Sequence, residues 1–378
     1  MSKKKRMSKK AEREERKKRR RRKRRKRIAV LFVEVVILAA LCVVAYGIFK
    51  LDKLDMNVLN LDNLEAYRDT GPYTNIALFG LDSRNGELEG GVQSDCIMIA
   101  SINNETHDVR IVSVYRDTLL QQADGTYEKA NSAYNIGGPE GAISLLNRNF
   151  DLDIQNYVSV NFSALVDVID ALGGIEMDMT AEEAFYSNGY AFETAQVVGQ
   201  EMIPIEEKAG TQLLDGVHAV GYARIRYTEG NDFKRTERQR VVLQKVAEKA
   251  KKANVLTLNE IVNKVFPQIS TNLTIKDMLG FAAHILDYNI VDTSGFPYAV
   301  TTDESVRNHE GSYVIPIDFV GNVTQLHENL FGETSYQPSE KVQQIHDDII
   351  YLSGVTEDTN AMESTFEGDI HDEGTQSE

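Results

Sequence analysis

The segment Tyr222–Arg240 holds the residues of this 378-residue chain that are best suited to chemistry, five arginines and one lysine inside an acidic region. In a strand, Tyr222, Arg224 and Arg226 would face the same way. One face of a predicted helix carries Arg235, Arg238, Gln239, Val242 and Val246. Arginines that continue an apolar stripe are costly to bury unless an anion meets them. The planar guanidinium binds phosphate oxygens in pairs, so we expect a phosphate or pyrophosphate ligand.

Three further polar pairs lie at the ends of predicted strands, where α/β domains place ligands. Taken singly, each pair fits a turn or a structural ion pair. Taken together, carboxylates and arginines at successive strand ends predict a site for a hard cation and a polyanion. These pairs are Asp82 with Arg84, Ser94 with Asp95, and Arg116 with Asp117.

Several common catalytic motifs are absent. The seven histidines show no His-x-x-x-His spacing and no Cys/His ligand pattern, so we do not expect zinc. Neither a Gly-x-Ser-x-Gly elbow nor a phosphate-binding Gly-x-x-x-x-Gly-Lys-Ser/Thr loop occurs. The glycine-rich run Gly137–Gly141 has flanks that do not fit a nucleotide-binding fingerprint.

Strand-like and helical patterns alternate from Thr74 onward, which predicts an α/β domain over residues 74–332 with helices on both faces of a sheet. The predicted strands are Asn75–Leu81, Ile97–Asn103, Val109–Val114, Tyr157–Val160, Ile175–Met179 and Gly221–Tyr227. The predicted helices include Pro139–Phe150, Ser163–Leu172 and Phe233–Ala253. Residues 255–354 gave no candidate site.

The charge is strongly segregated along the chain. Residues 1–27 hold 19 Lys and Arg against 3 Glu, and the rest holds 23 basic and 54 acidic residues. The apolar segment Ile28–Phe49 follows, and as a helix it would span about 33 Å, enough for a bilayer. A basic cytoplasmic tail, one transmembrane helix and an extracellular remainder are therefore predicted. A cleaved signal peptide is the competing interpretation, with Val44–Gly47 as a poor cleavage site.

The flanking segments have simpler patterns. Residues 50–73 show heptad-like leucines, which predict a short helical stalk or linker. Residues 355–378 are acidic and poor in aromatics, so we expect a disordered tail. Because Cys42 lies in the apolar segment, Cys96 is the single cysteine outside it, and no intramolecular disulfide is expected there.

An ordered set of short motifs resembles the LytR-CpsA-Psr (LCP) family, over roughly residues 74–250. Each motif is weak alone, and the order makes the set specific. The matching stretches are Asn75–Arg84, Ser94-Asp95, Ser113–Thr118, Lys129–Tyr134 with Gly137-Gly138, Leu172–Ile175, Leu214–Gly216, Ala223–Arg226 and Asp232–Gln239.

The resemblance implies an α-β-α sandwich around a mixed central sheet, with an apolar lipid pocket. It implies a membrane-anchored enzyme of a Gram-positive bacterium that transfers a glycopolymer, such as teichoic acid or capsule, from a polyprenyl-pyrophosphate carrier to peptidoglycan. Asp82 and Asp95 would hold Mg²⁺, with Mn²⁺ as the alternative. Catalytic roles would fall to Arg116, Arg224, Arg226, Arg235 and Asp232, and substrate-binding roles to Arg84, Lys129, Arg238 and Gln239.

This chain departs from the family pattern at three positions. Gln93 stands where arginine is usual, Tyr115 where proline is common, and Cys96 where threonine is common. We expect these differences to affect fine specificity and not the arginine and carboxylate core. The glycopolymer and any general base are not identified by the sequence.

Two rival functions share the same sequence features. A hydrolase would use water in place of the sugar acceptor at the same site. A membrane-anchored transcriptional attenuator or sensor would use residues 1–27 for DNA or a regulator. Those residues lack a folded DNA-reading motif, and the adjacent apolar segment favours interaction with anionic lipid, so no nucleic-acid partner is expected.

Overall fold

The computed structural model describes residues 55–56, 59–66, 70–83, 88, 91–228, 230–303 and 306–361. The predicted basic tail 1–27, the predicted membrane segment 28–49, Arg84 and residues 362–378 lie outside them. Among the helices within the described residues, none is long and apolar enough to cross a membrane.

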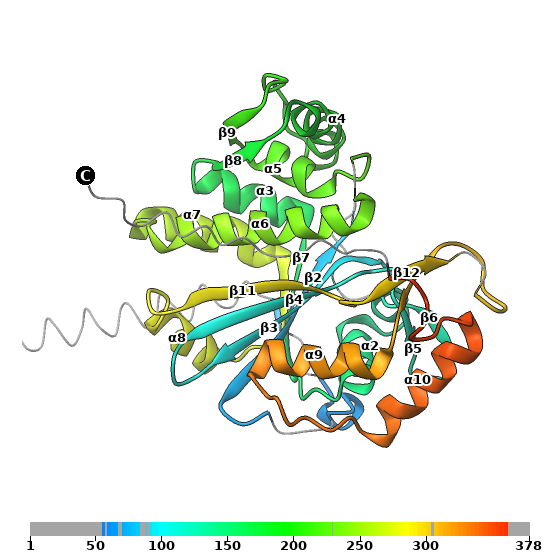
Figure 1. Cartoon of the computed structure of the whole chain (residues 1–378). Helices are drawn as coiled ribbons and strands as arrows, with labels where there is room; N and C mark the ends of the chain where they lie inside the picture. The colour runs from blue at the N-terminus through cyan, green and yellow to red at the C-terminus, as the bar shows by residue number, and fades with distance from the viewer. Residues whose placement is uncertain are drawn as a thin grey trace, which may run out of the picture. The chain divides into compact units, whose positions relative to one another are not determined.

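The described residues form a mixed α/β fold around one seven-stranded sheet (Figure 1). Its order is β1-β10-β7-β2-β3-β4-β11, with parallel pairs β1·β10, β7·β2 and β4·β11 and antiparallel pairs elsewhere. The strands are β1 (Asp55–Met56), β2 (Tyr73–Leu81), β3 (Ser94–Asn103), β4 (Asp108–Val114), β7 (Asn156–Asn161), β10 (Ile269–Thr271) and β11 (Asn289–Phe296).

One face of the sheet is sealed by α2 (Ser132–Phe150), α9 (Phe319–Phe331) and α10 (Glu340–Ser353). Period-two alternation directs Phe79 and Ile99 into this core, where they are almost completely buried. The Asp151 carboxylate follows α2 and accepts hydrogen bonds from the Tyr336 hydroxyl at 2.6 Å and from the backbone and hydroxyl of Ser339. These contacts fix the segment that enters α10.

The opposite face is covered by a second group of helices, which Figure 1 shows above the sheet. It contains α3 (Phe162–Ala171), α4 (Ala181–Val198), α5 (Gly216–Arg224) and α6 (Asn231–Lys251). Helices α4 and α5 approach closely at Gly221, where a Cβ would lie 2.8 Å from the Ser187 oxygen and the Ala191 nitrogen. A side chain at Gly221 would therefore push these helices apart.

The remaining elements are short. Three small sheets pair β5 (Leu119–Gln121) with β6 (Tyr127–Lys129), β8 (Ile175–Met179) with β9 (Gly210–Leu214), and β12 (Val300–Asp303) with β13 (Tyr313–Pro316). The helices are α7 (Val255–Val265) and α8 (Ile275–Ala283), with 3-10 turns η1 (Leu61–Asn63) and η2 (Phe266–Gln268).

Five of the six predicted strands and all three predicted helices are confirmed, with ends shifted by a few residues. The predicted strand Gly221–Tyr227 is wrong, because Asp215 caps a helix there by accepting from the His218 backbone N–H. The predicted helical stalk is also wrong over its described part, which contains β1 and η1. Its residue Leu64 is buried in the core.

The predicted domain end at residue 332 is too early. Val342, Ile345 and Ile349 of α10 are buried in the core on the sealed face, and Val355 joins them. Helix α10 is amphipathic, and its apolar side packs into the core on the sealed face of the sheet. The predicted disordered tail also begins too early, because its first residue, Val355, is buried in this core.

Candidate active site

Two carboxylates and three arginines meet where β3 begins and β4 ends. Asp95 accepts a hydrogen bond from Arg116 Nη1 at 2.7 Å, and its other oxygen lies 3.6 Å from Arg226 Nη2. Asp232 lies 3.4 Å from both Arg226 Nε and Arg235 Nη1, and 3.6 Å from Arg116 Nε. Each carboxylate is thus shared by several guanidinium groups.

The local structure of α6 explains how Asp232 and Arg235 reach this cluster. The helix begins after Gly230, whose φ of 89° lies in the left-handed region that favours glycine. Asp232 lies in the first turn, where a negative charge is stabilised by the helix dipole. Arg235 follows one turn later, is 3% exposed, and donates to the Asp95 carbonyl at 3.1 Å.

The electrostatics indicate a site prepared for an anion. Burial lowers the pKa of Arg235, Asp232 opposes this, and the positive charges of Arg116 and Arg226 lower it further. Burial alone would raise the pKa of Asp232, but the same three arginines hold it below its ordinary value. Among the described residues, the buried Nε of Arg235 has no hydrogen-bond acceptor, whereas the Nε of Arg116 lies 3.4 Å from Asp117 and 3.6 Å from Asp232. A polyanion could satisfy a donor such as the Nε of Arg235.

Arg224 lies beside this cluster and is held differently. Its Nη1 donates to the Thr194 hydroxyl at 3.1 Å, and its Nη2 lies 3.3 Å from a Glu193 carboxylate oxygen on α4. The guanidinium also lies over the rings of Phe162 and Tyr190, at 5.2 and 5.3 Å from their centroids. These contacts point the side chain across the mouth of a cavity.

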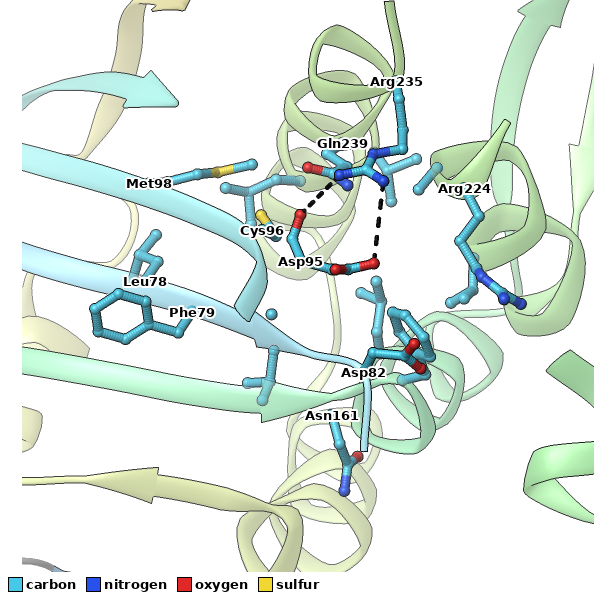
Figure 2. Close-up of a pocket in the computed structure, with 18 of the residues that line it drawn as sticks. Leu78, Phe79, Asp82, Asp95, Cys96, Met98, Asn161, Arg224, Arg235 and Gln239 are labelled. Atoms are coloured by element: carbon cyan, nitrogen blue, oxygen red, sulfur yellow. Dashed lines mark hydrogen bonds and ion pairs between the residues drawn. The ribbon is translucent and has the colours of Figure 1, made fainter. Parts of the chain in front are cut away.

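That cavity has a volume of about 420 Å³ and lies between the sheet and helices α3, α5 and α6 (Figure 2). Its wall is mostly aliphatic and aromatic, and charged groups gather at one end. The apolar lining includes Leu78, Met98, Val158, Val160, Phe162, Leu165, Tyr190, Val220, Ala223, Tyr227, Val242 and Leu243. The polar lining includes Asp82, Asp95, Asn161, Arg224, Arg226, Arg235 and Gln239.

Comparison with known proteins decides the family. The model of the LytR_cpsA_psr family matches residues 50–325. The chain belongs to this family.

Relatives and solved structures of the LytR_cpsA_psr family agree with that assignment. Over 234 residues the chain is 31% identical to the polyisoprenyl-teichoic acid–peptidoglycan teichoic acid transferase TagU of Enterococcus faecalis, covering 61% of this chain and 68% of the relative. The protein of the same name from Bacillus subtilis is 28% identical over 206 residues, which cover 54% of this chain and 61% of that one, less than two thirds of its length. The structure of YwtF (TagT) with bound octaprenyl pyrophosphate has a TM-score of 0.51 and 19% identity, and the match covers 70% of this chain and 92% of that chain, which shows the shared fold.

Asp82 and Asp95, the pair predicted to hold a metal ion, both line the charged end of the cavity (Figure 2). Asp95 forms ion pairs with Arg116 and Arg226, whereas none of the described residues forms an ion pair with Asp82. Two carboxylates at one cavity mouth are the oxygen ligands that Mg²⁺ takes, usually with phosphate oxygens and waters. The residues present therefore fit such an ion.

Three predicted substrate-binding residues are placed in different ways. Gln239 lines the cavity one turn after Arg235. Lys129 lies outside the cavity lining and pairs with Asp117 at 3.0 Å, and Asp117 in turn lies 3.4 Å from Arg116. Arg238 is 2% exposed and donates twice to Glu183 at 2.9 and 3.0 Å, away from the cavity. The structure thus gives Arg238 a contact between helices, and we leave it out of the proposed site.

The three departures from the family pattern lie around the same site. Cys96 lines the cavity, and burial raises the pKa of its thiol to about 12, so it stays protonated. Tyr115 is buried and packs edge-to-face on Phe233 of α6, with ring centroids 4.6 Å apart. Gln93 is exposed, and its carbonyl accepts from the Asp82 N–H at 3.3 Å.

Sequence reasoning missed the residues that shape the cavity mouth. Asn161 caps α3 by accepting from the Ala164 N–H at 2.9 Å, and it also lines the cavity. Tyr190 and Tyr227, which both line the cavity, stack nearly parallel, at 13°, with ring centroids 6.5 Å apart. The sequence signal available for Asn161 was its position before an apolar helical stretch. The two tyrosines lie 37 residues apart and carried no such signal.

Proposed function

We propose that this protein transfers a glycopolymer of the teichoic acid type from a polyprenyl-pyrophosphate carrier to peptidoglycan and releases polyprenyl phosphate. The observation that carries the proposal is the position of the arginine–carboxylate cluster at the charged end of an apolar cavity. The carrier consists of an apolar prenyl chain and a pyrophosphate. The apolar end of the cavity fits the chain, and the charged end fits the pyrophosphate. The relatives named as teichoic acid transferases support the polymer class.

The apolar part of the cavity supplies binding energy. Burying a prenyl chain among Leu78, Val158 and Leu243 removes apolar surface from water, worth about 0.8 kcal/mol for each buried CH₂ group. The cavity volume of about 420 Å³ lies within the range of small-molecule pockets. The chain beyond that volume would extend toward the membrane.

The arginines act on the phosphates. In the transfer, an acceptor sugar hydroxyl forms a bond to the phosphorus that carries the glycan. The bond from that phosphorus to the bridging oxygen breaks, and the hydroxyl proton is released. Negative charge grows on the departing polyprenyl phosphate, and Arg116, Arg226 and Arg235 neutralise it from fixed positions. Asp232 holds these guanidinium groups in place, so we assign it a positioning role.

Mg²⁺, or Mn²⁺ in its place, would be held by Asp82 and Asp95 and would supply positive charge to the pyrophosphate oxygens. Arg116 and Arg226 already contact Asp95, so they fix the orientation of its carboxylate toward the cavity mouth. Asp82 lies on the adjacent strand end and is positioned by its backbone contact with Gln93.

The proposed enzyme works on the outer surface of the membrane. The basic residues 1–27 and the apolar segment Ile28–Phe49 support an anchor with a cytoplasmic N-terminus and an extracellular catalytic domain. Both substrates, a lipid-linked glycan and peptidoglycan, are then within reach of the anchored domain.

The test uses the full chain in detergent with polyprenyl-pyrophosphoryl glycan, with and without peptidoglycan oligomers, and with Mg²⁺ or a chelator. We expect glycan covalently linked to the oligomers, equimolar polyprenyl phosphate, and loss of both products with the chelator. Release of polyprenyl phosphate at the same rate without oligomers would assign a hydrolase instead. Equal transfer in the chelator would remove the metal from the proposal.

A further inference from the structure

A second polar cluster lies at the far end of the central sheet, outside the site described above. His107 ends the turn between β3 and β4, and His284 and Asp287 follow α8. The ligand atoms of these three side chains all lie within 4.8 Å of one another. Among the described residues, this is the one such group of three or more His, Cys, Asp or Glu side chains.

The backbone brings these distant residues together and holds them. The His107 carbonyl accepts from the Asn289 N–H at 3.1 Å, where β11 starts beside β4. His284 is the C-cap of α8, and its carbonyl accepts from the Asp287 N–H at 2.8 Å. The cluster therefore joins the β3–β4 turn to the start of β11, the edge strand of the sheet.

The three side chains lie close together, with His284 and Asp287 exposed and His107 partly buried. The two imidazole rings stack with centroids 4.7 Å apart and an angle of 20°, and the Tyr288 ring packs edge-to-face with His107 at 5.4 Å. His284 Nδ1 lies 3.0 Å from the Asp287 carboxylate.

We propose that His107, His284 and Asp287 bind one Zn²⁺ ion. Two imidazole nitrogens and one carboxylate oxygen form a ligand set that zinc accepts, with water in the fourth position. A tetrahedral zinc site has ligand atoms about 3.3 Å apart, given metal–ligand distances of about 2.0–2.2 Å. In the structure the His284 Nδ1 and the Asp287 carboxylate lie 3.0 Å apart, close to that spacing. Zinc binding also requires the two stacked imidazole rings to rotate, so that a nitrogen of each ring faces the ion. Mg²⁺ is excluded as the preferred ion, because it selects oxygen ligands.

The role of this ion is to fasten the edge of the sheet. Asp95 and His107 lie at opposite ends of β3, which has 10 residues, so the two sites are separated by about 30 Å. Zinc bound at His107 would not touch the transferred phosphate. It would instead tie β11 and the end of α8 to the β3–β4 turn, and so stabilise the folded state by binding it selectively.

The experiment measures Zn²⁺ bound to the full chain in detergent. Excess Mg²⁺ is present so that it competes with Zn²⁺ for Asp82 and Asp95. We expect one zinc per wild-type chain, a visible ligand-field spectrum when Co²⁺ replaces it, and a rise in the thermal midpoint on adding zinc. His284→Ala and Asp287→Asn should weaken zinc binding at least tenfold and abolish the thermal rise.

The matched control is His346→Ala, because His346 also lies near a carboxylate, Asp318 at 3.8 Å, but belongs to no such cluster. It should keep the bound zinc. Equal zinc content in wild type and His284→Ala, or equal loss in His346→Ala, would overturn the proposal. Because His284 is half exposed, its alanine variant should fold as wild type in chelator, which thermal unfolding checks directly.

Discussion

Both faces of the central sheet carry apolar side chains, but the helices that cover the two faces pack against them differently. On the sealed face, Ile99 and Val112 are almost completely buried in a core with residues of α2, α9 and α10. On the opposite face, Leu78 and Met98 line a cavity of about 420 Å³ beneath α3, α5 and α6. The difference shows that strand alternation specifies two apolar faces, and that the helices decide which of them is left open.

The largest expected effect contrasts one leucine on each face. Leu146→Ala, in α2 on the sealed side, should lower the free energy of unfolding by about 2–5 kcal/mol, because it leaves a void in close packing. Leu78→Ala at the cavity wall should cost about 1 kcal/mol, because part of that side chain already faces open space. Urea unfolding of both variants measures the contrast, and equal losses would mean that the two faces are packed alike.

The next effect concerns the charged end of the open face. Arg226→Ala should reduce transfer by about 10²–10³-fold, because it removes a donor aimed at the developing charge. Arg307→Ala is the control, since that guanidinium lies over Tyr351 and lines no part of the cavity. Product formation on peptidoglycan oligomers is the measurement. Transfer near the wild-type rate in Arg226→Ala would remove the arginine cluster from the mechanism.

A smaller effect tests whether the cavity holds the lipid. Val158→Phe should weaken polyprenyl phosphate binding about tenfold, because the ring fills space that the chain needs. Val158→Ala enlarges the same space and should retain binding. Titration of a labelled polyprenyl phosphate into the full chain measures both. Unchanged affinity in the phenylalanine variant would place the lipid elsewhere.

The smallest expected effect is the pH dependence contributed by Asp232. Its folded pKa is lowered by Arg235, Arg116 and Arg226, against the effect of burial. Its stabilising contribution is therefore present above the unfolded pKa and is lost as the pH falls through the folded value. Asp232→Asn should lack this contribution, so the difference in unfolding free energy between it and wild type should shrink as the pH falls into the acid range. A constant difference would contradict the assignment.

Part of the site was predictable because it depends on local patterns. The ends of β2, β3 and β4 place Asp82, Asp95 and Arg116 at the same end of the sheet. Helical spacing places Arg235 and Gln239 on one face of α6. Arg238 shares that spacing but lies at the flank of the stripe, where Glu183 of α4 binds it. The sequence spacing therefore predicts which residues share a face of α6, but the contact with α4 determines that Arg238 does not reach the cavity.

The region 222–227 shows where local pattern misleads. Alternating Tyr222, Arg224 and Arg226 suggested a strand, yet the N-cap Asp215 and the packing of Gly221 against α4 select a helix through Arg224. Both arginines still line the cavity, because the chain leaves the helix at Ile225 in an extended conformation and directs Arg226 toward Asp95 and Asp232. The residues were correct and the predicted element was wrong.

The sequence by itself determined four strands of the sheet (β2, β3, β4 and β7), the chemistry of the arginines and carboxylates, and the ordered motifs of the family. Only the tertiary structure decided that one face of the sheet is open, that Arg238 binds Glu183, and that His107 lies beside His284, 177 residues further along the chain. The physical reason is the range of each effect. Alternation and helical spacing act between near neighbours, whereas cavities and ligand clusters depend on which distant elements pack together.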